Sequence, residues 1–565
     1  MSAYITQRLK AGWDLFRQRK LDEAEEIVAK LLKSQPDHCD ANALMANVQL
    51  YKKYIYRALA YAQAAVKSSP KNITARQTLI TVLTAVGDRR AALLQIKVML
   101  DMGAGDAELA MTHAGTLRDL WRYDESVKLY EEAIGKYPDN QLLPSLLPFT
   151  MQYAPRATRQ EIFAAHVAFG RSLDRMVPPV ARKHRNVPDP ERTLRVGVMS
   201  ADLYGHSVMF FFGSILEHAD PARVRFTAYQ TRDPGSDSMT ARLRSRFAGW
   251  REAFNDTPAK VAERMLTDEI DVLLDLNGLT TTLKGLEVMN HAPAPVIVTY
   301  CGYPDTTGVR SVQYRIVDSI TDPPGAEAFA VEELVRLDPC FLCYTPQVDA
   351  PLENPEPPCV RNGFVTFGSF NSIQKLNEGV IAAWTKIVLG VPGSKLLLKD
   401  FRLREPSLRK ELLALFQAAG LAEDRIELLE RAKETADHLR LYEKLDVALD
   451  PFPYNGTTTT CEAAHQGVPT VTLRGERHST RVGASLFTAI GVPELITTDV
   501  DEYVRRAIAL GTDAASLGVL RSTLRARMLA SPLCDARAFA ARFEGVLRGL
   551  WARWCRDGAG RGDRT

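Results

Sequence analysis

Four consecutive threonines follow a short apolar segment and could bind an anion. The stretch reads Asp450-Pro-Phe-Pro-Tyr-Asn-Gly-Thr-Thr-Thr-Thr-Cys-Glu462, in which a predicted strand enters a turn and then a helical segment. Backbone N–H groups at the start of a helix attract negative charge, and adjacent hydroxyls add further donors. Such a group of donors suits a diphosphate. The alternative is an ordinary helix N-cap with spare threonines, because threonine is a common capping residue.

A lysine stands in a second loop that the fold could place near the threonines. Lys375 ends the stretch FGSFNSIQK, in which a strand passes into a short polar loop. A lysine beside a bound diphosphate would neutralise the charge that develops as the diphosphate leaves. The alternative is a solvated surface lysine, because lysines are almost never fully buried.

Three histidines and one turn-rich loop are further candidates. His206 lies in MSADLYGHSV, directly after the first strand of the second half of the chain. Loops in that place face the ligand cleft of doubly wound folds, so His206 could act as a base or bind hydroxyl groups. His438 and His478 are similar cases, and a structural role is the alternative for each. The loop CGYPDTTG, residues 301–308, could form a wall of the cleft, although turn chemistry explains it equally well.

The sequence predicts no metal site. Asp499 and Asp501 form the only DxD pair, and they precede a predicted helix, where capping explains them. Cys340 and Cys343 form a CxxC without the second pair that a zinc site requires. We expect both to be small buried residues.

Two series of short apolar runs must position these side chains. Helical stretches such as AKVAERMLTDE separate several of the runs, and alternation of this kind predicts parallel sheets covered on both faces. Two sets of about five strands predict two Rossmann-like lobes with ligand at the strand ends. Neither a GxGxxG fingerprint nor a GxxxxGK[ST] loop is present, which disfavours a dehydrogenase or a P-loop kinase. The runs are residues 194–200, 224–231, 270–278, 294–302 and 314–319, then 364–370, 394–400, 425–430, 446–452 and 470–475.

The first 138 residues repeat every 34. Prolines at 36, 70 and 138, and small residues at Ala24, Ala58, Ala92 and Ser126, keep this register. A second series runs through Gly12, Ala46, Ile80 and Ala114. The period matches tetratricopeptide repeats, which are pairs of antiparallel helices. About four repeats are predicted, the third of them degenerate, and such arrays stack into a superhelix with a concave surface for a partner.

Composition limits the remaining possibilities. The chain has 565 residues, with 71 basic and 68 acidic side chains and a net charge of +3. This balance argues against a nucleic-acid binder. The N-terminal sequence has no signal-peptide core and no run of 18 apolar residues occurs, so we expect a cytoplasmic protein without membrane insertion.

Changes along the sequence predict five parts. They are tetratricopeptide repeats over 1–138, a linker helix and connector over 139–191, an N-terminal catalytic lobe over 192–355, a C-terminal catalytic lobe over 356–553 that binds a nucleotide sugar, and a polar tail over 554–565.

The motifs together resemble glycosyltransferase family 41, which includes the O-GlcNAc transferases and the SPINDLY proteins. The resemblance covers nearly the whole chain and is carried by RVGVMSADLYGHSV, VTYCGYPDTTG, VEELVRLDPCFLCYTP, NGFVTFGSFNSIQK, LDPFPYNGTTTTCEA and SPLCD. Several of these are closer to SPINDLY and its bacterial relatives than to animal O-GlcNAc transferase. The resemblance implies a tetratricopeptide superhelix followed by a GT-B unit of two lobes, an inverting mechanism, and no cofactor or catalytic metal.

The resemblance also implies roles for individual residues. Lys375 matches the family lysine that binds the donor diphosphate, and His206 matches the active-site histidine that was once proposed as the base. The matches around the nucleotide are His438 beside the base, Thr457, Thr458 and Thr459 in the phosphate loop, and Glu462 against the ribose. Animal O-GlcNAc transferase has a histidine where Thr457 stands.

The arm departs from the family pattern. Animal O-GlcNAc transferase has a ladder of asparagines along its superhelix, where this chain has Trp13, Asn47, Thr81 and Gly115. The sequence therefore does not predict the same mode of peptide capture.

Several functions stay open on the sequence. The first is transfer of GlcNAc from UDP-GlcNAc to Ser or Thr hydroxyls of proteins that the arm binds. The second is O-fucosylation from GDP-fucose, as the SPINDLY-like motifs favour, and the third is flagellin glycosylation with another activated sugar. A non-catalytic tetratricopeptide scaffold and a GT-B enzyme for lipid or glycan are rivals from other classes.

Overall fold

The computed structural model describes residues 2–557 apart from 236, 281, 347, 349–355, 431 and 433. The chain forms two compact units. The first comprises residues 1–143 and 401–418, and the second comprises residues 144–400 and 419–565.

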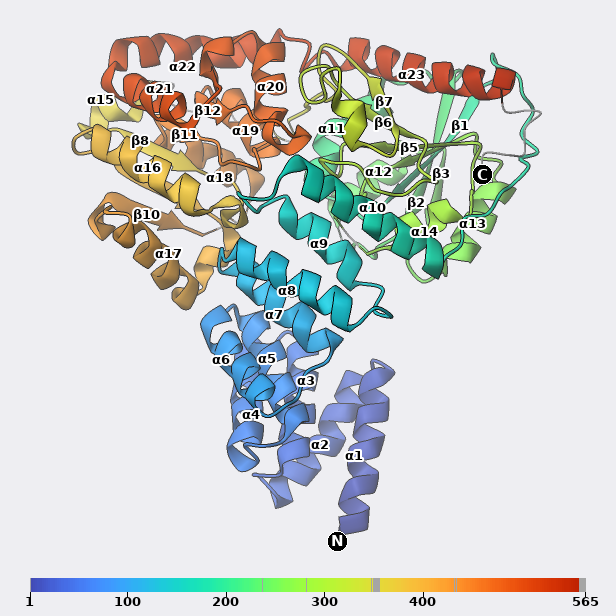
Figure 1. Ribbon diagram of the computed structural model, residues 1–565, viewed down its shortest axis with the longest axis vertical. Coiled ribbons are helices and arrows are strands. Elements are labelled where there is room, and N and C mark those ends of the chain that lie inside the picture. The colour runs from blue at the N-terminus through green and yellow to red at the C-terminus, as the bar shows by residue number, and fades with distance from the viewer. Residues whose placement is uncertain are drawn as a thin grey trace. The chain divides into compact units, whose positions relative to one another are not determined.

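The first unit is helical. Its helices up to residue 136 form four antiparallel pairs, as the 34-residue period predicts, and they are coloured blue in Figure 1. They are α1 (Ser2–Arg17), α2 (Leu21–Ser34), α3 (Cys39–Tyr51), α4 (Ile55–Ser68), α5 (Ile73–Val86), α6 (Arg89–Asp101), α7 (Ala107–Asp119) and α8 (Tyr123–Lys136).

Small residues at the repeat positions explain the packing of the pairs. Ala24, Ala58, Ala92 and Ser126 are completely buried, and the Ser126 hydroxyl donates to the Ala114 carbonyl over 2.7 Å. Side chains of this size let two helices approach closely. Ile80 fits the degenerate third repeat by packing with its neighbours in an apolar cluster.

A segment from far along the sequence also belongs to the first unit. It contains α17 (Pro406–Ala418), whose Glu411 pairs with Arg90 of α6. The side chain of Glu405 lies against Gly87. Sequence reasoning assigned this segment to the second lobe, because nothing in it follows the 34-residue period.

The first lobe of the second unit is a seven-stranded parallel sheet. Its order is β3-β2-β1-β4-β5-β6-β7, so the direction of winding reverses between β1 and β4. The strands are β1 (Leu194–Ser200), β2 (Val224–Gln230), β3 (Gly249–Glu252), β4 (Val272–Asp275), β5 (Val296–Tyr300), β6 (Tyr314–Val317) and β7 (Glu333–Arg336). The helices are α11 (Ser207–His218), α12 (Ser238–Arg244), α13 (Pro258–Thr267) and α14 (Lys284–Asn290).

The second lobe repeats this plan with six parallel strands. Its order is β10-β9-β8-β11-β12-β13, and the reversal falls between β8 and β11. The strands are β8 (Thr366–Ser369), β9 (Lys395–Lys399), β10 (Ile426–Leu429), β11 (Val447–Leu449), β12 (Thr470–Leu473) and β13 (Ile496–Thr497). The helices are α15 (Pro358–Asn362), α16 (Glu378–Gly390), α18 (Thr435–Arg440), α19 (Thr458–His465), α20 (Val482–Ile490), α21 (Val500–Thr512) and α22 (Ala514–Leu529).

The predicted architecture of helical repeats followed by two Rossmann-like lobes is confirmed. Each predicted apolar run contains a strand, whereas β3, β7 and β13 were not predicted. All three lie at an edge of their sheet. Edge strands have fewer buried neighbours, so they lack the continuous apolar run that marks a central parallel strand.

Two helices precede the first lobe, and one long helix follows the second. α9 spans Leu143–Met151, and α10 spans Arg159–Met176 within the predicted linker. α23 (Ala536–Asp557), drawn in red in Figure 1, ends the described chain. It packs against α11 of the first lobe. Residues 554–557, predicted as tail, belong to this helix, while 558–565 lie outside the described residues.

α23 is also tied by polar contacts to the first lobe and to the connector that precedes it. Glu544 accepts a hydrogen bond from the Asp220 backbone at 2.6 Å, and the Trp551 indole donates to the Asp189 carbonyl at 2.9 Å. Within the described residues, no helix is long and apolar enough to cross a membrane.

Candidate functional site

The reversal between β8 and β11 brings Lys375 and the threonine loop together. In doubly wound sheets, ligands bind where the loops after two such strands diverge. Lys375 ends the short turn after β8, and its ammonium donates to the Asn455 carbonyl at 2.7 Å and to Asn371 Oδ1 at 3.1 Å. It also lies 4.6 Å from the centre of the Tyr454 ring.

The Lys375 side chain is partly buried, and it forms no ion pair within the part of the chain that the structure describes. Burial lowers the pKa of Lys375 to about 8, and Asp450 opposes this shift. Among the described residues, its hydrogen-bond acceptors are both neutral oxygens. A cation in such a place gains strongly from an anionic ligand, because screening is weak inside a protein.

Asp450 holds the turn between β11 and the threonines in place. Its carboxylate is fully buried and accepts hydrogen bonds from the Gly456 backbone and the Thr472 hydroxyl, each at 2.6 Å. Burial raises the pKa of Asp450 to about 7, although these two hydrogen bonds and Lys375 counteract it. The carboxylate therefore holds the turn that leads into the threonines.

The threonines begin α19. Thr457 occupies the N-cap position, but its side chain makes no capping hydrogen bond. The first N–H groups of a helix have no partner within the helix, so this end presents backbone donors. Thr459 donates to Asn371 Oδ1 at 2.9 Å, while the buried Thr460 hydroxyl has no hydrogen-bond partner among the described residues.

Gly456 allows the two loops to approach. A Cβ atom there would lie 2.6 Å from Thr460 Oγ1, 2.8 Å from Thr459 Oγ1 and 2.9 Å from Asn371 Oδ1. A side chain at this position would push the threonine hydroxyls apart. The glycine therefore keeps the donors of both loops in one place.

His438 and Glu462 lie in direct contact beside this loop. His438 Nε2 is 3.0 Å from Glu462 Oε2, and His438 Nδ1 is 2.5 Å from Lys399 Nζ at the end of β9. The Tyr442 hydroxyl also donates to Glu462, at 3.3 Å. The two candidates therefore form one polar cluster, to which sequence reasoning did not assign Lys399 or Tyr442.

His206 lies in the other lobe, after β1. It caps α11, where its Nδ1 accepts from the Val208 backbone at 3.4 Å and lies 3.9 Å from Asp202 Oδ2. Burial lowers the pKa of His206, Asp202 raises it and Arg232 lowers it, with a net decrease. Among the described residues, no hydrogen bond or ion pair joins His206 to the second-lobe site.

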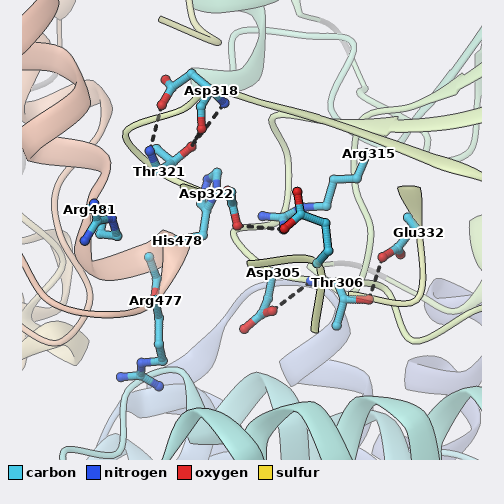
Figure 2. Close-up of polar contacts among 12 residues, drawn as sticks. Asp305, Thr306, Arg315, Asp318, Thr321, Asp322, Glu332, Arg477, His478 and Arg481 are labelled. Carbon is cyan, nitrogen blue, oxygen red and sulfur yellow. Dashed lines mark hydrogen bonds and ion pairs between the residues drawn. The ribbon is translucent and has the colours of Figure 1, made fainter. Parts of the chain in front are cut away.

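His478 forms a contact between the two lobes. Its Nδ1 lies 2.5 Å from Asp322 Oδ2, and both side chains are buried. Figure 2 labels both residues. Burial would raise the pKa of Asp322, but His478 and Arg315 hold it well below its ordinary value. Arg481 adds a hydrogen bond to the Ile320 carbonyl at 2.6 Å. These contacts give His478 a structural position.

The turn-rich loop 301–308 is held in place from several sides. The Thr306 hydroxyl donates to the buried Glu332 at 2.5 Å, a pair drawn in Figure 2. Gln152, which follows α9, donates to Asp305 at 2.7 Å and accepts from Ser479 of the second lobe at 3.2 Å. The loop therefore meets both lobes.

The acidic and cysteine candidates have structural explanations. Asp499 caps α21 by accepting from the Glu502 backbone at 2.7 Å. Cys340 and Cys343 are buried free thiols, and burial raises the pKa of both. Over the described residues, no group of three or more His, Cys, Asp or Glu side chains is arranged to hold a metal ion.

Comparisons with known proteins agree on one family. The model of glycosyl transferase family 41 matches residues 118–343 and 359–543. SPINDLY of Arabidopsis thaliana, a probable UDP-N-acetylglucosamine–peptide N-acetylglucosaminyltransferase, is 38% identical over 423 residues, which are 74% of this chain and 46% of that protein. The UDP-N-acetylglucosamine–peptide N-acetylglucosaminyltransferase of Caenorhabditis elegans is 24% identical and covers 76% of this chain and 48% of its own.

A solved structure matches nearly from end to end. A mutant of the O-GlcNAc transferase of Thermobaculum terrenum aligns with a TM-score of 0.80 and 28% identity, covering 98% of both chains. This chain spans about half the length of the curated relatives that it matches. It belongs to glycosyl transferase family 41.

Proposed function

We propose that this chain is an inverting protein O-glycosyltransferase, with UDP-GlcNAc as the first candidate donor. The observation that carries the proposal is the partly buried Lys375 ammonium, whose hydrogen-bond acceptors among the described residues are neutral oxygens and which lies next to the uncapped start of α19. A nucleoside diphosphate is the ligand whose charge this arrangement complements.

The proposed reaction is a direct displacement. A Ser or Thr hydroxyl of a protein attacks the anomeric carbon, the bond to the diphosphate breaks, and the nucleoside diphosphate leaves. The hydroxyl is a weak nucleophile, so positioning and stabilisation of the leaving charge supply most of the acceleration. Lys375 and the first turn of α19, with Thr457, Thr458 and Thr459, provide that stabilisation.

The nucleoside of the donor lies beside His438 and Glu462 in this proposal. Their contact at 3.0 Å places both side chains next to the threonine loop, which supports a nucleoside there. His206 approaches the sugar or the acceptor from the first lobe. Its lowered pKa keeps the imidazole neutral near pH 7, so it is able to accept a proton or a hydrogen bond.

GDP-fucose is the second candidate donor. SPINDLY proteins that are 38% identical to this chain have names that specify UDP-N-acetylglucosamine, whereas the SPINDLY-like motifs of the sequence favour GDP-fucose. A flagellin glycosyltransferase that uses another activated sugar shares the same diphosphate chemistry. We place the reaction in the cytoplasm and propose that the helical arm binds the acceptor protein.

The decisive experiment compares the wild type with Lys375→Ala. Calorimetry with UDP, GDP, UDP-GlcNAc and GDP-fucose identifies the nucleotide, and sugar transfer to a protein acceptor or to the chain itself measures turnover. We expect Lys375→Ala to lose about 10²–10³-fold in rate at an unchanged melting temperature, because it removes a preorganised charge donor. Near-normal activity of this variant with every donor would contradict the proposed site and favour a non-catalytic scaffold.

Metal independence is a separate part of the proposal. Lys375 and the helix start would neutralise the diphosphate without a divalent ion. Turnover should therefore continue in excess EDTA. Loss of turnover in EDTA with recovery on adding Mg²⁺ or Mn²⁺ would refute this part.

A further inference from the structure

One neutral amide joins the two loops of the candidate site. Asn371 follows β8, and its side-chain oxygen accepts hydrogen bonds from the Lys375 ammonium at 3.1 Å and from the Thr459 hydroxyl at 2.9 Å. The side chain is 9% exposed. The same oxygen lies 2.9 Å from the place where a Cβ on Gly456 would stand, so it fills the space between the loops.

The hydrogen bonds of Asn371 fix the orientation of its amide, with the oxygen toward Lys375 and Thr459. Asn371 Nδ2 donates to the Ser369 hydroxyl at 3.4 Å, at the end of β8. An ammonium has donors only, so the atom facing Lys375 must be the amide oxygen. The orientation of this side chain therefore follows from its partners.

The neutrality of this acceptor matters for a ligand that is itself an anion. The bond from the Lys375 ammonium to the amide is already charge-assisted, because its donor is ionised. A carboxylate would add the attraction of a full opposite charge. A carboxylate in place of the amide would hold the Lys375 ammonium tightly and cancel its charge. An amide orients the same ammonium but leaves that charge for a ligand.

We infer that Asn371 is a positioning residue, whose neutral oxygen aligns Lys375 and Thr459 for a diphosphate without competing for the lysine charge. This inference rests on the proposed function. An arriving phosphate oxygen displaces only a neutral acceptor from the ammonium, and the donors already stand in place when it arrives.

The test compares two substitutions of Asn371. Asn371→Asp keeps the size of the side chain and the oxygen that accepts from Lys375 and Thr459, but it adds a negative charge and loses the amide donor to Ser369. Asn371→Ala removes that oxygen and that donor and adds no charge. Calorimetry with UDP and GDP, together with kcat and KM for the donor, is carried out on the full chain. Wild type and both variants are first matched by melting temperature and circular dichroism.

We expect the aspartate variant to be the weaker binder. Asn371→Ala should weaken nucleoside diphosphate binding about threefold, and Asn371→Asp about tenfold or more, because the ligand must then break an ion pair with Lys375 and is repelled by the new carboxylate. If Asn371 were only a structural acceptor, the order would be reversed, since aspartate keeps the acceptor and alanine does not.

Three results would overturn the inference. The first is an aspartate variant that binds the nucleotide as tightly as the wild type does, or more tightly than the alanine variant does. If the wild type binds nucleotide normally, this result leaves the proposed function intact. The second is a folded Asn371→Ala variant whose nucleotide affinity and turnover equal those of the wild type. This result decides the question if Asn371→Asp does not fold. The third is a wild-type chain that binds neither UDP nor GDP, which contradicts the proposed function as well.

Discussion

Lys375 keeps its charge over a limited range of pH. Because burial lowers its pKa to about 8, the ammonium loses its proton as the pH rises through that value. Affinity for UDP or GDP should therefore fall by up to about tenfold per pH unit above 8. Asp450, whose pKa burial raises to about 7, acts in the same direction because its ionisation adds negative charge nearby. Calorimetry between pH 7 and 9.5 measures the effect.

Lys375→Arg provides the control for this pH dependence. A guanidinium stays protonated throughout the range, so the variant should bind more weakly but with little dependence on pH above 8. A wild-type affinity that stays constant up to pH 9.5 would show that the lysine does not contact the diphosphate.

His206 should affect turnover rather than nucleotide affinity. It stands in the first lobe and makes no described contact with the groups around Lys375. We expect His206→Ala to lower kcat by about 10²-fold or more if it assists proton transfer, with UDP or GDP affinity within twofold of the wild type. The measurement is calorimetry beside a transfer assay. Loss of nucleotide binding in a folded variant would place this histidine at the donor instead.

At the residue scale, charged and hydroxyl groups were predictable, but their neutral partners were not. Lys375 and the threonines stand in polar loops after apolar runs, which is a local signal. Asn371, Asn455 and Tyr454 gave no such signal, because an asparagine or tyrosine in a loop suits many turns. Their role depends on contacts such as that between Asn371 and Thr459, 88 residues apart.

At the scale of the elements, the backbone of the loop 301–308 lies directly against the backbone of α10. Gly308 has φ +73°, and a Cβ atom on it would lie 2.1 Å from the His166 carbonyl oxygen of α10. Gly308→Ala should therefore force helix and loop apart and lower the melting temperature by about 10 °C or more, or prevent folding. Thermal unfolding of the full chain tests this.

Gly325→Ala is the matched control for that substitution. Gly325 has φ +95°, but a Cβ there would meet nothing within 4 Å. It carries the same kind of backbone strain, which costs about 1–2 kcal/mol, without the clash. Equal losses of stability in the two variants would show that the close approach of α10 is unimportant.

The elements that sequence reasoning missed are those with the least burial or the most distant partner. The edge strands β3, β7 and β13 lack apolar runs, since each pairs on one side only. α17 is amphipathic like any surface helix, and its sequence does not reveal that it packs with α6.

For the molecule as a whole, the arm should fold without the rest of the chain. The pairs α1 to α8 bury their own repeat positions. The Arg90–Glu411 contact with α17 is a surface ion pair with Arg90 mostly exposed, so its loss should cost under about 1 kcal/mol. Expressed alone, residues 1–140 should give a helical circular-dichroism spectrum and bind neither UDP nor GDP. A β-rich or unfolded spectrum would contradict the repeat assignment.

The order of the parts was predictable from the periodicity of the sequence, whereas the packing of the last helix, α23, on the first lobe was not. A 34-residue period and alternating strands are properties of neighbouring residues. The packing of α23 on the first lobe joins residues more than 300 positions apart, such as Asp220 and Glu544, and an amphipathic helix fits many surfaces.

Because α23 is the last helix of the described chain, the first lobe is synthesised well before the helix that covers it. The sheet and helices of the lobe are complete by about residue 345, but Phe543 and Trp551 of α23, which pack in its apolar cluster, come about 200 residues later. At translation rates of about 5–20 residues per second, the apolar face of α11 stays uncovered for about 10–40 s on the ribosome. We therefore expect this face to be exposed in the nascent chain until the last helix emerges.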